Sequence, residues 1–442
     1  MLPTHPLRER TGGMDDLTRR GFIAGSAATA AVTVAGGPAE AGAASRRAPV
    51  SELPRPDESG IDHIVVVMME NRSFDHYLGW LPGADGKQAG LTFTDKEGKE
   101  HSTHHLKVPH GCGFQDPDHG YVGGRVQLNG GKCDGWLRSG DSDVFAIGYF
   151  EGPDLNFYGG AARDWTVCDR YFPAIMSSTF PNRIFQHAGQ TDRISNAFEF
   201  CELTTIWDRL AARKVPHRYY FSDVPFTALW GLRHLGISRH ITEFYGDAAR
   251  GRLPAVSFVE PGFVGELVPG LAEDEHPLAD IRFGQHFLNK VYEAITNSPN
   301  WRRTLLIINY DEWGGFFDHV VPPEGPDPRP DLGTGLRGFR VPCLLISPRA
   351  RRGAIAHEVY DHTSILKAIE WRWGLEPLSV RDAAARNIAE TLDFDGEPNL
   401  DAPRYKAPRP ITLGCIAPGH VHYGDDWDQL RRYAIKKDFG RR

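Results

Sequence analysis

The chain has 442 residues, of which 40% are apolar, and a formal net charge of -7. This length accommodates one large α/β domain or two ordinary domains, with enough apolar side chains for a sizeable core. The acidic balance argues against a nucleic-acid partner, because nucleic-acid-binding proteins gain affinity from basic contacts to phosphates.

The first 44 residues have the pattern of an export signal. Arg19 and Arg20 precede a mildly apolar stretch, residues 21–36, and small residues follow at positions 39–43. This order is typical of a signal peptide, and the paired arginines indicate the twin-arginine type. The alternative is a disordered alanine-rich tail. We expect export by the twin-arginine machinery to a secreted or cell-envelope location, with residues 45–60 as a linker.

The first strong structural signal is the apolar run from Ile64 to Met69. Its continuous, mostly β-branched character predicts a buried strand of a parallel sheet. Glu70 and Asn71 follow at the point where the strand should end. Ligands of open α/β sheets bind at the carboxyl ends of the strands, and carboxylate and amide oxygens suit a divalent cation.

Residues 80–160 are rich in Gly, His and Asp with little periodicity, which predicts long functional loops. The six cysteines of the chain show no CxxC spacing, so a zinc-thiolate cluster is not expected. Cys112 and Cys133 bracket this region and form a plausible disulfide. Cys343 lies in a later apolar run and is expected to be a buried free thiol.

A hydroxyl-rich segment, residues 176–189, precedes a predicted helix. Pro181 suits the first turn of that helix and Gly189 suits its end. Thr179 then lies at or just before the helix N-terminus, which attracts anions such as a phosphoryl group. Arg183, one turn into the helix, could brace the same region. The alternative for Thr179 is a simple N-cap, and two neighbouring hydroxyls are rivals for a reactive role: Ser177 and Ser178.

Residues 165–380 alternate short apolar runs with helical patterns, as expected for a parallel sheet with crossover helices. The predicted strands are His217 to Phe221, Ala255 to Val259, Thr304 to Asn309 and Pro342 to Ile346. The predicted helices include Thr205 to Lys214, Ile281 to Thr296 and Thr363 to Trp373. We expect one domain over residues 61–395, with residues 396–442 as a C-terminal extension packed on it.

The strand predicted at Thr304 to Asn309 is also followed by acids, Asp311 and Glu312. Two neighbouring strands that each end in carboxylates can place those oxygens on one metal ion. Oxygen ligands suit Mg²⁺, Ca²⁺ or Mn²⁺, and added imidazole ligands would also suit Zn²⁺ or iron. The alternative is that these acids only cap strand-to-loop turns. We expect one divalent metal ion, whose identity the sequence leaves open.

Several histidines lie beside acids or at strand boundaries. His119, His276, His319 and His362 each follow an acidic residue, and His217 opens a predicted strand. Imidazoles can donate to phosphate oxygens, act as general acids or bind metal.

The chain resembles the bacterial phosphoesterase family, which contains secreted phospholipases C and an acid phosphatase and belongs to the alkaline-phosphatase-like superfamily. The resemblance covers about Ile61 to Leu375. It is carried by MMENRSFDHYLG (Met68 to Gly79), NGGKCDGW (Asn129 to Trp136), TFPNR (Thr179 to Arg183), EDEHP (Glu273 to Pro277), YDEWGGFFDHV (Tyr310 to Val320) and DHTSILKAIEWRWG (Asp361 to Gly374).

The resemblance implies an alkaline-phosphatase-like fold, a mixed but mostly parallel sheet flanked by helices, with long active-site loops. It implies a role for each candidate residue. The metal ligands would be Glu70, Asn71, Asp311 and Glu312. The nucleophile would be Thr179, and the residues facing the phosphoryl group or leaving group would be His119, His217 and His276. The substrate-binding residues would be Arg183, His319 and His362. Phospholipases of the family more often have Gly-Pro at the positions of Ser177 and Ser178.

Related sulfatases use a Cys- or Ser-x-Pro-x-Arg motif whose first residue is converted to an aldehyde. This chain has Thr179-Phe180-Pro181-Asn182-Arg183 in that frame. Threonine cannot supply the aldehyde, so arylsulfatase activity is disfavoured.

Together these features predict a secreted phospholipase C that hydrolyses the glycerol-side phosphodiester bond of phospholipids through a phospho-threonine intermediate. One alternative is an acid phosphatase, a broad phosphomonoesterase. Another is a secreted protein that binds phosphate esters without catalysis. Transient contact with a membrane surface is possible through loop aromatics, which could equally pack against the sheet: Trp80, Trp136 and Phe157.

Overall fold

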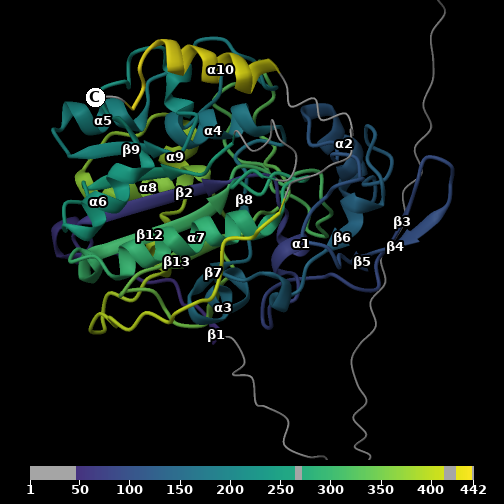
Figure 1. Ribbon diagram of the computed structural model, residues 1–442, viewed down its shortest axis with the longest axis horizontal. Coiled ribbons are helices and arrows are strands. Elements are labelled where there is room, and N and C mark those ends of the chain that lie inside the picture. The colour runs from purple at the N-terminus through teal and green to yellow at the C-terminus, as the bar shows by residue number, and fades with distance from the viewer. Residues whose placement is uncertain (1–45, 264–270, 413–424, 441–442) are drawn as a thin grey trace, which may run out of the picture. The chain divides into compact units, whose positions relative to one another are not determined.

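The computed structural model describes residues 46–263, 271–412 and 425–440, so the predicted signal peptide lies outside the described residues. A nine-stranded sheet crosses the described part of the protein, with helices on both sides (Figure 1). This arrangement confirms the predicted α/β class. In spatial order the strands are β1 (Arg46–Arg47), β14 (Ala354–Ala356), β7 (Thr166–Cys168), β13 (Cys343–Ile346), β12 (Thr304–Tyr310), β2 (His63–Met69), β11 (Val256–Glu260), β9 (His217–Phe221) and β10 (Ser238–His240).

The sheet is mostly parallel, as predicted, with one exception. Strand β13 runs antiparallel to both of its neighbours, β12 and β7. The five strands from β12 to β10 are all parallel, so their carboxyl ends meet at one edge. Strands β2 and β12 lie side by side near the middle of the sheet. Their apolar side chains are buried, as expected for strands of a sheet that is covered on both faces. Three two-stranded sheets complete the strands: β15 (Tyr360–Asp361) with β8 (Tyr171–Phe172), β3 (Thr92–Thr94) with β4 (Glu100–Ser102), and β5 (His104–His105) with β6 (Gly148–Tyr149).

Successive residues of β12 show the two faces of the sheet. Asn309 contacts Tyr171, whose ring packs on His362 of one helix layer. Tyr310 packs on Tyr158 of the other layer. This alternation is the normal pleat of a strand. The helices are α1 (Phe74–Leu78), α2 (Tyr121–Leu128), α3 (Tyr158–Asp164), α4 (Thr179–Ala188), α5 (Ile206–Ala212), α6 (Ile241–Ala249), α7 (Ile281–Thr296), α8 (His362–Trp373), α9 (Val380–Ala384) and α10 (Asp425–Lys436).

Most predicted elements form within one or two residues of their expected bounds. Strand β9 and helix α7 match them in full. Helix α8 begins at His362, where the Asp361 side chain accepts a hydrogen bond from the Thr363 N–H, and it ends at Gly374 with φ +60°. Asp361 is thus the N-cap of the helix, and Gly374 is its left-handed C-cap.

The segment predicted as a linker, residues 45–60, is partly structured. Arg46–Arg47 pairs with β14 as the edge strand β1, so the description of this segment as a linker is wrong there. In the C-terminal extension, the Tyr405 ring packs on Phe157 of the main domain. Trp427 of α10 packs on Phe180 of α4. None of the helices in the described ranges combines the length and apolar character needed to cross a membrane.

The cysteine pairing differs from the prediction. Cys133 is a buried free thiol, whereas Cys112 is disulfide-bonded, so the predicted Cys112–Cys133 bond is wrong. Cys343 is a buried free thiol, as expected. The two residues of the predicted pair lie in the loop region, where the sequence has no periodicity from which to infer distances.

The loop aromatics pack against the protein. Trp136 and Phe157 are fully buried. Trp80 is half-buried, and its indole N–H donates to the Tyr77 carbonyl. The packing alternative is therefore confirmed for Trp136 and Phe157, which cannot reach a lipid surface in this conformation.

Candidate functional site

Two strand ends bring the predicted acids together. Tyr310 of β12 is level with Met69 of β2, and the Asp311 N–H donates to the Met69 carbonyl at 3.1 Å. Glu70 and Asp311 therefore leave adjacent parallel strands at the same edge. Glu70, Asp311 and the next residue, Glu312, are all fully buried. The prediction that the two segments meet at one site is confirmed.

Asn71 is held in a conformation that aims its side chain. Its φ is +59°, which a non-glycine residue rarely adopts and which costs free energy unless the surroundings require it. Its N–H donates to Oδ1 of Asp311 at 3.2 Å, and its Nδ2 lies 3.5 Å from Nε2 of His119. Its Oδ1 is buried without a hydrogen-bond partner among the described residues. The amide oxygen is thus available as a neutral metal ligand.

The Gly-Gly turn after Glu312 allows the site to close. Gly314 has φ +63°, and a Cβ there would lie 2.1 Å from the Asn71 carbonyl oxygen. Gly315 has φ +70°, and its Cβ would lie 2.6 Å from Pro117. Only glycine tolerates both the positive φ and these approaches. The turn therefore packs the Asn71 backbone against the loop that carries His119.

The charges of the site favour a cation. Burial, and then the neighbouring Asp311, raise the pKa of Glu312 well above its ordinary value. Oε2 of Glu312 accepts from the Gly314 N–H at 2.7 Å, but Oε1 has no hydrogen-bond partner within the described ranges. Clustered buried carboxylates without enough positive charge are costly. The hard oxygens of Glu70, Asn71, Asp311 and Glu312 are of the type that suits a divalent ion, and their role as metal ligands stays a prediction.

Thr179 is the first residue of α4 and is almost fully buried. Ser178 occupies the N-cap position without a side-chain cap bond, and the Ser177 hydroxyl donates to the Ile194 carbonyl. The next backbone N–H, that of Phe180, donates to Asn196 at 2.8 Å. Pro181 has no N–H. The predicted anion site at this helix start is therefore limited chiefly to the Thr179 backbone N–H and the helix dipole.

Arg183 links the start of α4 to the strand ends. It is fully buried, and its guanidinium donates to Asp311 at 3.1 Å and to Glu260, with Glu70 3.3 Å away. Burial opposes its charge, but these carboxylates raise the pKa of Arg183 overall. Arg183 thus ties α4, and with it Thr179, to the ends of three strands, while its substrate-binding role stays a prediction.

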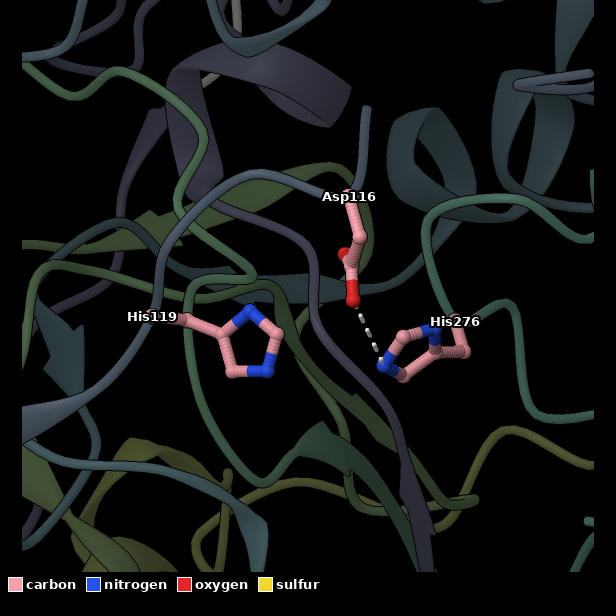
Figure 2. Close-up of side chains that lie close together, drawn as sticks. All are labelled: Asp116, His119 and His276. Carbon is pink, nitrogen blue, oxygen red and sulfur yellow. Dashed lines mark ion pairs between the residues drawn. The ribbon is translucent and has the colours of Figure 1, made fainter. Parts of the chain in front are cut away.

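His119 and His276 lie close together, as Figure 2 shows. The His119 Nε2 lies 3.9 Å from Glu312 Oε1, and the two imidazole rings are 5.7 Å apart. Asp116 joins them, with Oδ2 3.9 Å from His276 Nε2. Burial lowers the pKa of His276 well below its ordinary value, which keeps this imidazole neutral. The structure thus brings two of the three predicted phosphoryl-facing histidines to the strand ends.

His217 lies at the opposite edge of the sheet. It opens β9, level with Val256 of β11 and, through that strand, with Ile64 of β2. Glu70 is six positions after Ile64, a distance of about 20 Å at the rise of a strand. The Nδ1 of His217 donates to the Val215 carbonyl at 2.7 Å. The predicted contact between His217 and the phosphoryl group is therefore wrong.

His319 and His362 are held by other protein groups. His319 contacts Asp75 through Nδ1 at 2.6 Å and Asp85 through Nε2 at 3.1 Å. His362 is fully buried, and its Nε2 donates to the Tyr310 carbonyl at 3.0 Å. Burial lowers the pKa of His362 to about 4. Both ring nitrogens of His319, and the Nε2 donor of His362, are thus bonded within the protein, and their substrate-binding roles stay predictions.

Two site residues were missed from the sequence. Glu260 ends β11 in the same way that Glu70 follows β2, so a strand followed by an acid was a usable signal. Asp116 lies in an irregular loop next to Pro117, where no pattern distinguishes it from the other acids of residues 80–160.

Comparison with known proteins places these features in context. The phosphoesterase family model matches residues 61–376. Non-specific phospholipase C6 of Arabidopsis thaliana is 30% identical over 405 residues, which cover 82% of this chain and 76% of that protein. Phospholipase C B of Mycobacterium tuberculosis is 30% identical over 478 residues, which cover 90% of this chain and 89% of that protein. A structure from Vibrio parahaemolyticus, in the alkaline phosphatase superfamily, aligns with a TM-score of 0.38 and 9% identity over 74% of this chain and 70% of that one.

Proposed function

The chain belongs to the phosphoesterase family, and we propose that it is a metal-dependent phospholipase C. The reaction is hydrolysis of the glycerol-side phosphodiester bond of phospholipids. One observation carries this proposal: Arg183 holds the start of α4, with Thr179, against the strand ends that supply Glu70 and Asp311. The similarity to relatives named as phospholipases C, at 27–31% identity, supports the substrate class.

The nucleophile in this proposal is the Thr179 hydroxyl. A divalent ion held by the four ligands described above would lower the pKa of that hydroxyl and offset negative charge on the phosphoryl group. Ser177 is a weaker candidate, because its hydroxyl is already bonded to the Ile194 carbonyl. The buried position of Thr179 limits access of bulk water before substrate binds.

The chemical steps follow from this placement. The Thr179 oxygen attacks phosphorus, the bond from phosphorus to the glycerol oxygen breaks, and diacylglycerol leaves with a proton. Water then cleaves the phospho-threonine and releases the phosphorylated head group. The Thr179 backbone N–H and the α4 dipole favour the extra negative charge on phosphorus oxygens. In this proposal His119, which lies 3.9 Å from Glu312, and its neighbour His276 contact the phosphoryl group or the leaving group.

The proposal is tested by comparing two classes of substrate with purified protein. Phosphatidylcholine hydrolysis should release diacylglycerol and phosphocholine, and p-nitrophenylphosphorylcholine should also be cleaved. Cleavage of p-nitrophenyl phosphate alone would establish the phosphomonoesterase alternative. Metal binding without cleavage of either class would establish a binding protein. Thr179→Ala, assayed in parallel, controls for contaminating hydrolases.

Export is a separate part of the proposal. Arg19 and Arg20, with the apolar stretch that follows, support the twin-arginine route. Residues 1–44 fused to a reporter should direct its export in a bacterium with a functional twin-arginine system. Replacement of both arginines by lysine should retain the reporter inside the cell. Export of the lysine variant at the normal level would contradict the assignment.

A further inference from the structure

We propose that Asp116, His119 and His276 form a second divalent-cation site, one that takes a transition-metal ion of the zinc type. This inference deepens the proposed function, because the second ion would face the same phosphoryl group as the first. The role of the ion rests on that function, but its binding does not. Figure 2 shows the three side chains converging from two separate segments of the chain.

The ligand atoms are already close. One atom of each side chain lies within 4.8 Å of the other two, and Asp116 Oδ2 is 3.9 Å from His276 Nε2. Donors around a tetrahedral zinc ion are roughly 3.3 Å apart, given metal–ligand distances near 2.1 Å. Small side-chain rotations would therefore complete the site. Asp116 is on the exposed side of the cluster, so an ion can enter from solvent.

His119 presents the correct nitrogen. Its Nδ1 lies 2.7 Å from the Pro117 carbonyl, which can only accept a hydrogen bond, so Nδ1 carries the proton. The unprotonated Nε2, which lies 3.5 Å from Asn71 Nδ2, is then left as an acceptor for an ion and is the ring nitrogen nearer the first site. A ligating histidine in proteins typically donates its other N–H to such a carbonyl, which fixes the ring orientation.

The backbone around His276 is also set in advance. Glu275 has φ +74°, an unfavourable conformation for this residue type. Arg72 stabilises it by donating to the Glu275 carbonyl at 2.7 Å and to the His276 carbonyl at 3.3 Å. The His276 N–H donates to Asp274 at 2.8 Å, and the Asp274 carbonyl accepts from the Glu70 N–H. The segment that carries His276 is thus hydrogen-bonded directly to Glu70, one of the proposed ligands of the first ion.

A second cluster of similar composition shows what distinguishes this one. Asp75, Asp318 and His319 also bring their ligand atoms within 4.8 Å. There, Arg340 donates to both aspartates, so a guanidinium already supplies the positive charge. Near Asp116, the guanidinium of Arg72 is directed instead to His76 and to the two carbonyls named above.

The donor set indicates the class of ion. Two imidazoles and one carboxylate suit zinc and its neighbours rather than Mg²⁺ or Ca²⁺, which prefer oxygen ligands. Three protein ligands leave a coordination position for a phosphate oxygen or water. His119 Nε2 lies 3.9 Å from Glu312 Oε1, so the two sites adjoin, as in enzymes that clamp a phosphoryl group between two ions.

The test is the metal stoichiometry of the purified full chain after loading with Zn²⁺ and removal of loosely bound ions. The wild type should hold two ions per chain, and Asp116→Asn should hold one, with affinity for the second reduced at least about tenfold. Asp141→Asn, which removes an exposed acid from the same loop region, should retain two. Titration of the wild-type protein with Co²⁺ should give a visible absorption band from imidazole-bound cobalt, which Asp116→Asn weakens.

A wild-type stoichiometry of one, unchanged in Asp116→Asn, would overturn the second site. So would a cobalt spectrum that is the same in both proteins. Both measurements report metal binding and do not require turnover. Phospholipid hydrolysis by a protein that holds a single ion would overturn the second site but leave the proposed function intact. Two bound ions without hydrolysis of any substrate would support the site while refuting the function.

Discussion

Arg183 donates a hydrogen bond from Nε to Oδ2 of Asp311 at 3.1 Å, and neither side chain has any exposed surface. This pair joins helix α4 to the end of β12. Through it, the residue that starts the helix and the residues that end the strands become one rigid unit. The pair gives the arginine that lies one turn after the proposed nucleophile a structural role.

Replacing Arg183 should therefore destabilise the protein as well as reduce activity. Arg183→Met leaves the Glu260 and Asp311 carboxylates buried without their partner, and we expect a loss of about 3–5 kcal/mol in the free energy of unfolding. Urea denaturation measures this change. Arg302→Met, which removes an exposed ion pair with Glu397, is the control and should cost under about 1 kcal/mol. An Arg183→Met protein of normal stability but raised KM would support the substrate-binding assignment.

The hydroxyl assignment is tested by single substitutions at the start of α4. Thr179→Ala should lower kcat by about a thousandfold or more, because the covalent step loses its nucleophile, while the midpoint of thermal unfolding stays near that of the wild type. Ser177→Ala should retain turnover, since the Ser177 hydroxyl is hydrogen-bonded to the Ile194 carbonyl. With phosphatidylcholine as substrate, rapid acid quenching and intact-mass measurement should detect a covalent phosphocholine adduct on the wild type but not on Thr179→Ala. A phosphocholine adduct that persists in Thr179→Ala would assign another nucleophile.

The Gly-Gly turn gives a steric prediction. Gly314→Ala would place a Cβ 2.1 Å from the Asn71 carbonyl oxygen at a positive φ. The turn must shift, so we expect weaker metal binding and a lower kcat together, measured by metal analysis and initial rates. Gly236→Ala is the control, because a Cβ there meets no atom within 4 Å. Normal metal content in Gly314→Ala would show that Asn71 does not depend on this turn.

Glu370 on α8 should make stability depend on pH. Burial, and then the adjacent Asp382, raise the pKa of Glu370 from 4.5 to about 9. Between these two values the folded state keeps a proton that the unfolded chain has released, so the free energy of unfolding falls as pH rises. Glu370→Gln removes this loss and should stabilise the protein by up to about 3 kcal/mol at pH 7.

Chemical denaturation across pH 5 to 9 checks this prediction. The wild-type curve should fall with pH more steeply than that of Glu370→Gln. Glu97→Gln, at an exposed position, should follow the wild type. Parallel wild-type and Glu370→Gln curves would mean that Glu370 is ionised in the folded state.

The strand-end acids could be predicted from the sequence because their signal is local. A continuous apolar run must be buried on both faces, and the residue that follows it must lie at the edge of the sheet. His217 shows the limit of the same logic. It opens its strand rather than ending it, and in a set of parallel strands the two ends lie on opposite edges. Strand direction therefore excluded it from the site, although its identity as a histidine had suggested otherwise.

The partners of each polar side chain were decided by tertiary structure alone. Arg183, His319 and His362 all lie in motifs that carry the family resemblance. In the structure Arg183 is bonded to Asp311, His319 to Asp75 and His362 to the Tyr310 carbonyl. Asp116 carries no sequence signal, but it lies beside two histidines, one of which is 160 positions away in the chain. The sequence by itself determined the strands of the sheet, their burial and the acids at the strand ends, because these depend on the pattern of neighbouring residues. Which charges meet, and which are already satisfied, depends on contacts between distant segments, and only the folded chain specifies those.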